Sequence, residues 1–286
     1  MGETAQICEL CRAPLESVDG IERWGRCSRP ICHHFQRIRA EIIEKTVDCI
    51  RDYVPPPINA WERFASKVFP MVNASASHER NRKEWDDLYL PEAPGRLLGI
   101  GMGDLELFSK AANRGWQTSV FHPDAGICSE WKEKGLAVRQ GMPNWGDLAD
   151  GCMDAVVLRW CLEQISDVEE CVKNAWRTVA NRGRLVIVCW NANSYGREVC
   201  ASRWLPFCLS KYLRIFTPAG LRYLASRTGV VGRHVIFTSS AGQLPQTFPI
   251  EKETCKGGEL LQKRAFAMLE ESPMSGEATV FVAIKE

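Results

Sequence analysis

Four cysteines near the N-terminus have the spacing of a metal site. Two residues separate Cys8 from Cys11, and four separate Cys27 from Cys32. The first spacing lets two thiolates reach one ion from a tight turn, and the second pair can then close a tetrahedron around it. Mainly thiolate ligation in a setting without redox chemistry favours Zn²⁺, and a closed set of four ligands is structural. We therefore predict a structural zinc site here.

The sequence leaves the fourth ligand open. Cys32 is followed directly by His33 and His34, and each of the three could complete the set. Residues 1–32 are rich in turns and short of large apolar side chains, so a metal ion would help this segment to fold. Two other interpretations remain, namely unbound thiols in a loop and a redox-active Cys-x-x-Cys pair.

A second group of residues, from Gly95 to Phe108, could hold a ligand through its backbone. It reads Gly-Arg-Leu-Leu-Gly-Ile-Gly-Met-Gly-Asp-Leu-Glu-Leu-Phe, which predicts a buried strand, a glycine-rich turn and the start of a helix. Because Gly101 and Gly103 lack a Cβ atom, backbone N–H groups at the helix start can approach a ligand closely. Asp104, in the same turn, either caps the helix or faces the ligand.

Strands and helices alternate around this turn. Apolar runs predict strands at 96–101, 117–121, 136–140, 153–159, 184–190, 231–238 and 277–284. Helices are predicted at 104–114, 125–134, 167–180, 218–227 and 258–270. Such alternation is typical of a parallel sheet with helices on both faces. Thr217 and Pro218 have the residue types of a helix cap and first turn, and the last two strands are expected to form an antiparallel pair.

The N-terminal third has a different pattern. From about His34 to Tyr53, apolar residues recur every three or four positions, which predicts a helix that Pro55 stops. Two more helices are predicted at 59–71 and 79–88. We therefore divide the chain into a zinc-binding module with its helix (1–54), a linker with lead-in helices (55–94) and a sheet domain (95–286).

Four segments together resemble the class I S-adenosylmethionine (SAM)-dependent methyltransferases. In order and spacing they are the glycine-rich stretch 95–108, Trp116–Asp124, Met153–Ile165 and Gly183–Asn193. The resemblance implies an α/β, Rossmann-like, seven-stranded sheet that is parallel except for a C-terminal antiparallel hairpin. A small zinc-binding, helical N-terminal region would precede it. Some methyltransferases that act on sugars have a similar cysteine-rich N-terminal module.

The resemblance implies cofactor contacts at Gly101, Gly103, His122, Met142 and Arg159. The family usually has Asp or Glu at the place of His122 to accept both ribose hydroxyl hydrogens, whereas a neutral imidazole accepts only one. Asp124 either substitutes in part for that carboxylate or caps the next helix. Met142 and Trp145 either enclose the adenine ring or belong to the core. Arg159 introduces a cation where the fourth strand opens onto the ligand, which favours an anionic ligand.

The first functional hypothesis is a methyltransferase that acts on a small molecule or glycan precursor. Both family histidines that could remove a proton are absent, since Gln164 stands in the Leu-Glu-His motif and no histidine precedes Phe216-Thr-Pro. Catalytic residues are therefore unassigned, although Tyr212 could orient a substrate hydroxyl. Methyl transfer depends heavily on orientation, so an already nucleophilic acceptor needs no strong base.

The second hypothesis is a catalytically inactive methyltransferase-fold protein that binds a protein partner. Gly99 and Leu105 replace the acidic residue and the third turn glycine of the family, and with His122 they converge on the cofactor position. Such a protein could present exposed aromatic side chains to a partner. The candidates are Trp61, Trp85 and Trp204, each of which is otherwise expected to be a partly buried packing residue.

Charge and hydropathy argue against nucleic-acid and membrane partners. The net charge is +1, and the first 54 residues carry eight Lys/Arg against nine Asp/Glu. No apolar run approaches the roughly 20 residues that a membrane helix needs. The segment Met1–Gln6 lacks the basic and apolar parts of a signal peptide. We therefore expect a cytoplasmic protein with reduced thiols.

Overall fold

A computed structural model describes most of the chain. The described residues are 6–18, 24–32, 34–38, 90–91, 93–101, 105–200, 204–208, 212–238 and 276–286. The helices predicted at 59–71, 79–88 and 258–270 lie outside these ranges, as do Gly103 and Asp104. Among the described residues, no helix is both long and apolar enough to cross a membrane.

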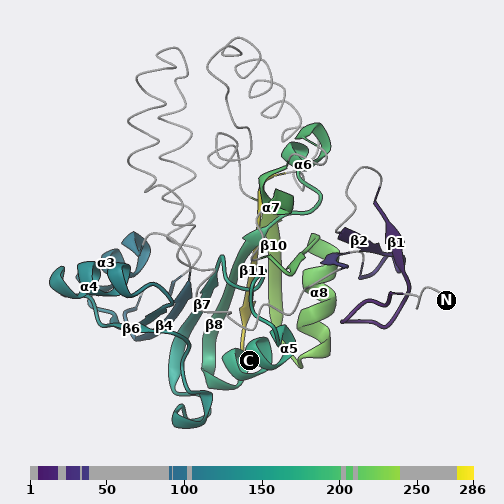
Figure 1. Ribbon diagram of the computed structural model, residues 1–286. Helices are drawn as coiled ribbons and strands as arrows, with labels where there is room; N and C mark the ends of the chain where they lie inside the picture. The colour runs from purple at the N-terminus through teal and green to yellow at the C-terminus, as the bar shows by residue number, and fades with distance from the viewer. Residues whose placement is uncertain are drawn as a thin grey trace, which may run out of the picture. The chain divides into compact units, whose positions relative to one another are not determined.

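A seven-stranded, mostly parallel sheet has the strand order β10-β11-β8-β7-β4-β5-β6 (Figure 1). Its strands are β4 (Arg96–Gly101), β5 (Gln117–His122), β6 (Val138–Gln140), β7 (Met153–Arg159), β8 (Val179–Trp190), β10 (Arg233–Thr238) and β11 (Ala278–Ile284). Strand β4 pairs in parallel with β5 and β7, and β5 pairs in parallel with β6. The predicted seven-stranded sheet is thus confirmed, with β10 and β11 as neighbours.

Helices lie between the strands along the chain. They are α3 (Glu106–Asn113), α4 (Ala125–Glu133), the 3₁₀ turn η2 (Trp145–Asp147), α5 (Val168–Thr178), α6 (Tyr195–Cys200), α7 (Leu205–Cys208) and α8 (Pro218–Arg227). Four of them, α3, α4, α5 and α8, follow the strands where the alternating pattern predicts them, and η2, α6 and α7 were not predicted. Asp124 caps α4, since its Oδ1 accepts a hydrogen bond from the Ile127 N–H at 2.9 Å. Thr217 caps α8 in the same way, through the Gly220 N–H at 3.0 Å. Asp124 is therefore a helix cap.

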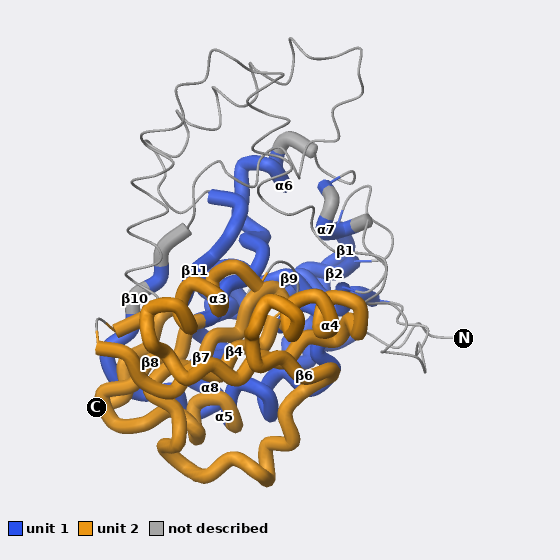
Figure 2. Tube along the Cα trace, turned by 90° about the vertical axis from the view of Figure 1, so that its left-hand side faces the viewer, with its two compact units in different colours: residues 1–44, 162–173, 187–281 blue, residues 45–161, 174–186, 282–286 orange. Residues whose placement is uncertain are grey.

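The chain forms two compact units (Figure 2). Unit 1 comprises residues 1–44, 162–173 and 187–281, and unit 2 comprises 45–161, 174–186 and 282–286. In unit 2, α3 and α4 pack beside β5 and β6 (Figure 1). The neighbouring strands β4 and β7 are apolar and buried over residues 97–101 and 155–158, as expected for parallel strands covered on both faces. The division into 1–54, 55–94 and 95–286 stays a prediction.

Unit 1 contains a second, four-stranded sheet with the order β1-β2-β3-β9. Its strands are β1 (Leu15–Ser17), β2 (Trp24–Cys27), β3 (Phe35–Arg37) and β9 (Arg214–Ile215), and each neighbouring pair is antiparallel. The prediction of a helix from about His34 to Tyr53 was therefore wrong for Phe35–Arg37, which form a strand, and residues 39–53 lie outside the described ranges. Pairing of β3 with both β2 and β9 outweighs the local helical pattern, and Phe35 packs on Phe207 with ring centroids 5.4 Å apart.

Two aromatic residues are buried where the sequence suggested exposure or substrate contact. Trp204, expected at a partner surface, is fully buried and packs edge-on against Trp190 and Phe207. Tyr212 is 1% exposed, and its hydroxyl accepts a hydrogen bond from the Trp190 indole N–H at 3.0 Å. Packing partners from other segments cover both side chains, so Trp204 is a packing residue, as the sequence also allowed. A substrate contact of Tyr212 stays a prediction. Trp61 and Trp85 lie outside the described ranges.

Candidate functional site: a strand-end cofactor site and a cysteine cluster

Four of the five predicted cofactor residues lie at or just beyond the carboxyl ends of adjacent parallel strands in unit 2. Arg159 ends β7, Gly101 ends β4 and His122 ends β5, while Met142 comes two residues after β6. The register pairs Gly101 with Arg159. The Gly141 N–H donates a hydrogen bond to the His122 carbonyl at 3.0 Å, which ties the loop after β6 to the end of β5. Ligands of open parallel sheets bind at this edge.

Gly101 packs closely against the neighbouring strand. A Cβ atom at this position would lie 3.1 Å from the Arg159 carbonyl oxygen, closer than most Cβ contacts. A side chain here would have to push β4 and β7 apart at the point where both strands end. The glycine therefore keeps the two backbones close, in addition to any contact that it makes with a ligand.

The hydrogen bonding of His122 determines what the imidazole can offer a ligand. The side chain is 2% exposed, and its Nδ1 accepts a hydrogen bond from the Asp124 backbone N–H at 3.0 Å. In a neutral ring the proton is therefore on Nε2, which donates rather than accepts. The sequence argument allowed one hydrogen bond accepted from a ribose hydroxyl, but the accepting nitrogen already has a backbone donor. An Nε2–H donor to a hydroxyl oxygen is the remaining option.

The two other departures from the family pattern lie in the core of unit 2. A Cβ atom at Gly99 would lie only 2.3 Å from Cε1 of Phe108, whose ring is fully buried. Leu105 precedes helix α3 and is 1% exposed, so its side chain packs inside the protein. Core packing thus accounts for both residues, and His122 is the departure that concerns the strand ends directly.

The loop after β6 presents an apolar side chain to its surroundings. Met142 is 44% exposed, so it is not a core residue, and Trp145 is half-buried in η2. Arg177 of α5 holds this loop by donating hydrogen bonds to the carbonyls of Trp145 at 2.7 Å and Leu148 at 2.8 Å. A polarisable thioether on a fixed loop is suited to pack against a flat ring.

Sequence reasoning did not single out Trp160, which follows Arg159 directly at the end of β7. Its φ angle is +56°, a left-handed conformation that is rare for a bulky residue. Non-glycine residues in this region cost of order 1–3 kcal/mol and cluster at functional sites. No sequence signal could have found it, since nothing in the residue type indicates the backbone angle.

Residues 98–187 match the family model of a methyltransferase domain. A SAM-dependent methyltransferase from Archaeoglobus fulgidus superposes with a TM-score of 0.53 at 15% identity, over 79% of this chain and 99% of that protein. The chain has the SAM-dependent methyltransferase fold. No curated protein sequence matches this chain.

Other proteins with the methyltransferase fold are also similar in structure. A possible histamine N-methyltransferase from Thermotoga maritima has 18% identity and a TM-score of 0.48, over 80% of this chain and 96% of that one. A 1,6-didemethyltoxoflavin-N1-methyltransferase from Burkholderia thailandensis has 11% identity and a TM-score of 0.49, over 88% and 95%. That structure contains 1,6-didemethyltoxoflavin and S-adenosylhomocysteine.

The cysteine cluster lies in unit 1, outside the matched methyltransferase domain. The sulfur atoms of Cys8, Cys11, Cys27 and Cys32 lie within 4.8 Å of one another, and all four side chains are buried. The Cys8–Cys32 and Cys11–Cys27 sulfur pairs are 3.7 and 3.4 Å apart. Zinc–sulfur bonds of about 2.3 Å in a tetrahedron place sulfurs about 3.8 Å apart, so this donor set fits Zn²⁺.

The thiols of the cluster differ in acidity. A hydrogen bond from Cys32 lowers the pKa of Cys8 to about 3, and the same interaction raises the pKa of Cys32. The Cys11 backbone N–H also donates to the Cys8 sulfur at 3.3 Å. The geometry therefore favours a thiolate at Cys8, the form that binds metals. His34 Nδ1 lies 3.3 Å from the Cys32 sulfur and adjoins the cluster, whereas His33 lies outside the described ranges.

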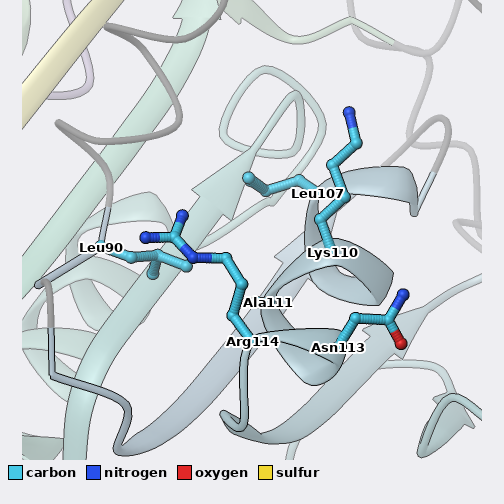
Figure 3. A pocket seen from close by; sticks show the side chains of 6 residues that line it. All are labelled: Leu90, Leu107, Lys110, Ala111, Asn113 and Arg114. Carbon is cyan, nitrogen blue, oxygen red and sulfur yellow. The ribbon is translucent and has the colours of Figure 1, made fainter.

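A separate pocket of about 300 Å³ lies beside α3 (Figure 3). Its lining residues are Leu90, Leu107, Lys110, Ala111, Asn113 and Arg114. The lining is mainly apolar and includes none of the four described strand-end residues. This pocket is therefore distinct from the candidate cofactor site.

Proposed function

We propose that this chain is a SAM-dependent methyltransferase with a structural zinc module. One observation carries the proposal: Arg159, Gly101, His122 and Met142 converge at the strand ends of a sheet with the methyltransferase fold. This is the edge at which open α/β sheets bind their ligands. The site lies within a single compact unit, so one compact part of the chain supplies all four residues.

Each of these residues has a proposed role in holding SAM. Gly101 gives the cofactor access to the backbone, and His122 donates its Nε2–H to a ribose hydroxyl oxygen. The exposed Met142 packs on the adenine ring. Arg159 is half-buried, and its proposed partner is the carboxylate of the methionine part of SAM. This pairing gives the arginine an anionic partner although the sulfonium group of SAM is itself positively charged.

The proposed acceptor is a small molecule or glycan precursor with an oxygen, nitrogen or carbon nucleophile. Its lone pair attacks the methyl carbon in line as the sulfur–carbon bond breaks, and S-adenosylhomocysteine leaves. The protein contributes mainly by orienting the two reactants, so an acceptor that is already nucleophilic suffices. Gly99 and Leu105, which suggested an inactive protein, are instead explained by packing in the core.

The four cysteines are the proposed ligands of one structural Zn²⁺. The close approach of four buried sulfurs supports this proposal, as does the thiolate form of Cys8. Four protein ligands leave no open coordination position, so the ion stabilises the module rather than activating water.

Calorimetric titration of the zinc-loaded protein with SAM and S-adenosylhomocysteine tests the proposal. We expect micromolar binding of at least one ligand, with at least tenfold weaker binding in His122→Ala. Lys134→Ala, which removes an exposed lysine just after α4, serves as the control with unchanged affinity. Absence of both heat and thermal shift at millimolar ligand would refute the methyltransferase proposal.

A further inference from the structure

Arg214 of β9 connects two segments that are far apart in the sequence. Its guanidinium is 2% exposed and forms a bidentate pair with the carboxylate of Glu9, with Nη2 at 2.9 Å from Oε2. The same group donates hydrogen bonds to the carbonyls of Leu162, Ile165 and Ser166. All these residues belong to unit 1. A planar guanidinium with five N–H donors can hold this many acceptors at once, whereas a lysine cannot.

On one side, this arginine reaches the cysteine cluster. Glu9 lies between the proposed ligands Cys8 and Cys11 in the sequence, and its Oε1 is 3.7 Å from His34 Nε2. The other nitrogen of this imidazole, Nδ1, is 3.3 Å from the Cys32 sulfur. His34 is fully buried and stacks on Phe216, which fixes its ring plane. Outer groups of this kind orient the ligands of metal sites.

On the other side, Arg214 holds the segment 162–166. The N–H of the preceding residue, Leu213, donates a hydrogen bond to the Glu163 carbonyl at 2.7 Å. Together, Leu213 and Arg214 thus bind four of the five carbonyls in the segment. Glu163 and Gln164 are buried although they are polar. The segment begins three residues after Arg159, the last residue of β7.

We propose that the zinc module braces segment 162–166 through Glu9 and Arg214, which makes Arg214 a positioning residue for the segment that follows β7. The inference rests on the zinc part of the proposed function. A bound ion would hold the side chains of Cys8 and Cys32 in place. Cys32 contacts His34, His34 contacts Glu9, and Glu9 in turn holds the Arg214 guanidinium against the carbonyls of the segment. Loss of the ion frees the carboxylate, and the arginine then no longer holds the segment in one geometry.

Hydrogen exchange measured by mass spectrometry on the full-length protein tests this brace, with zinc bound and after chelation. In the wild type, chelation should raise exchange at least fivefold in peptides covering 162–166 and 212–216, but not in peptides covering 117–122. In zinc-loaded Glu9→Gln, exchange at 162–166 should already be raised, and chelation should add nothing. A purely structural role for Glu9 would leave the response to zinc intact.

Two further variants sharpen the result. Arg214→Lys keeps the positive charge but loses the branched set of N–H donors of the guanidinium. This variant should therefore still bind zinc but show raised hydrogen exchange at 162–166. Glu16→Gln breaks an exposed pair with Arg26 in the same small sheet and should respond to zinc as the wild type does. The brace is refuted if zinc has no effect at 162–166, or if zinc-loaded Glu9→Gln matches the wild type. The zinc content of each protein is measured separately, so loss of zinc binding is distinguished from loss of the brace. The experiment does not use SAM, so its result does not depend on whether the protein binds SAM.

Discussion

The ring of Phe108 in α3 fills the space beside Gly99 in β4. A Cβ atom on Gly99 would lie 2.3 Å from Cε1 of that ring, well inside any allowed contact. Sheet and helix therefore touch at a point where the family resemblance implies an acidic side chain. The missing carboxylate is a consequence of how this helix packs on this strand.

This contact predicts a specific coupling between the two positions. Gly99→Ala should destabilise the protein by about 1–3 kcal/mol, because an overpacked core must move the ring or the backbone. Phe108→Leu makes room, so the double variant should be more stable than the sum of the two single effects predicts. Urea unfolding of the four proteins measures the coupling, and strictly additive free energies would contradict the contact.

A carboxylate at position 122 should strengthen cofactor binding. His122→Asp supplies two acceptors for the ribose hydroxyls, and hydrogen bonds to charged groups contribute about 1.5–3 kcal/mol each before the cost of burying the carboxylate. We therefore expect S-adenosylhomocysteine to bind about tenfold more tightly by calorimetry. His234→Asn, on the exposed end of β10, should leave binding unchanged. Weaker binding in His122→Asp would mean that the imidazole donor contributes more to cofactor binding than a buried carboxylate does at this position.

Metal analysis distinguishes ligands from outer groups in the cysteine cluster. Cys27→Ser should lower zinc affinity by more than ~100-fold, whereas His34→Gln, acting from outside, should lower it by about 10–100-fold. Cys128→Ser changes a buried thiol outside the cluster and should keep one zinc per chain. Competition with a chromophoric chelator gives these affinities. Equal losses for Cys27→Ser and His34→Gln would make the histidine a ligand.

Two buried carboxyl groups each contribute stability that is lost as the pH rises. Burial raises the pKa of Glu163 and that of Glu277 from 4.5 to about 7. At these two groups the folded state therefore holds protons that the unfolded state releases, so their contribution to stability is greatest below pH 4.5 and is lost as the pH rises through about 7. Each group contributes up to about 3 kcal/mol.

Chemical unfolding between pH 5 and 8 measures this slope. Glu163→Gln keeps an amide oxygen to accept the Trp190 N–H, now bonded to Glu163 Oε1 at 2.7 Å. Its stability relative to the wild type should therefore increase as the pH rises from 5 to 8, because the variant lacks the group whose contribution is lost. Glu169→Gln, an exposed carboxylate paired with Arg227, should leave the slope unchanged. A difference in stability between the wild type and Glu163→Gln that stays constant from pH 5 to 8 would contradict the raised pKa of Glu163.

Local patterns predicted the large sheet closely. The strand at 96–101 and the helix at 218–227 have the predicted bounds, because apolar periodicity and cap residues such as Thr217 act over a few neighbouring positions. Cysteine spacing likewise predicted the group that includes Cys8 and Cys11. It left the fourth member open, and the fold brings Cys32 into the cluster from the second turn.

What the sequence determined by itself was the order along the chain of the strands of the seven-stranded sheet and of helices α3, α4, α5 and α8, and the residue types at the strand ends, since these depend on local chemistry. Only the tertiary structure decided that Phe35 belongs to a strand, that Trp204 is buried and that Phe108 packs on Gly99. It also joined Glu9 to Arg214, residues separated by most of the chain. These outcomes depend on which distant segments meet, and contact between distant segments is a property of the packed chain that no local pattern contains.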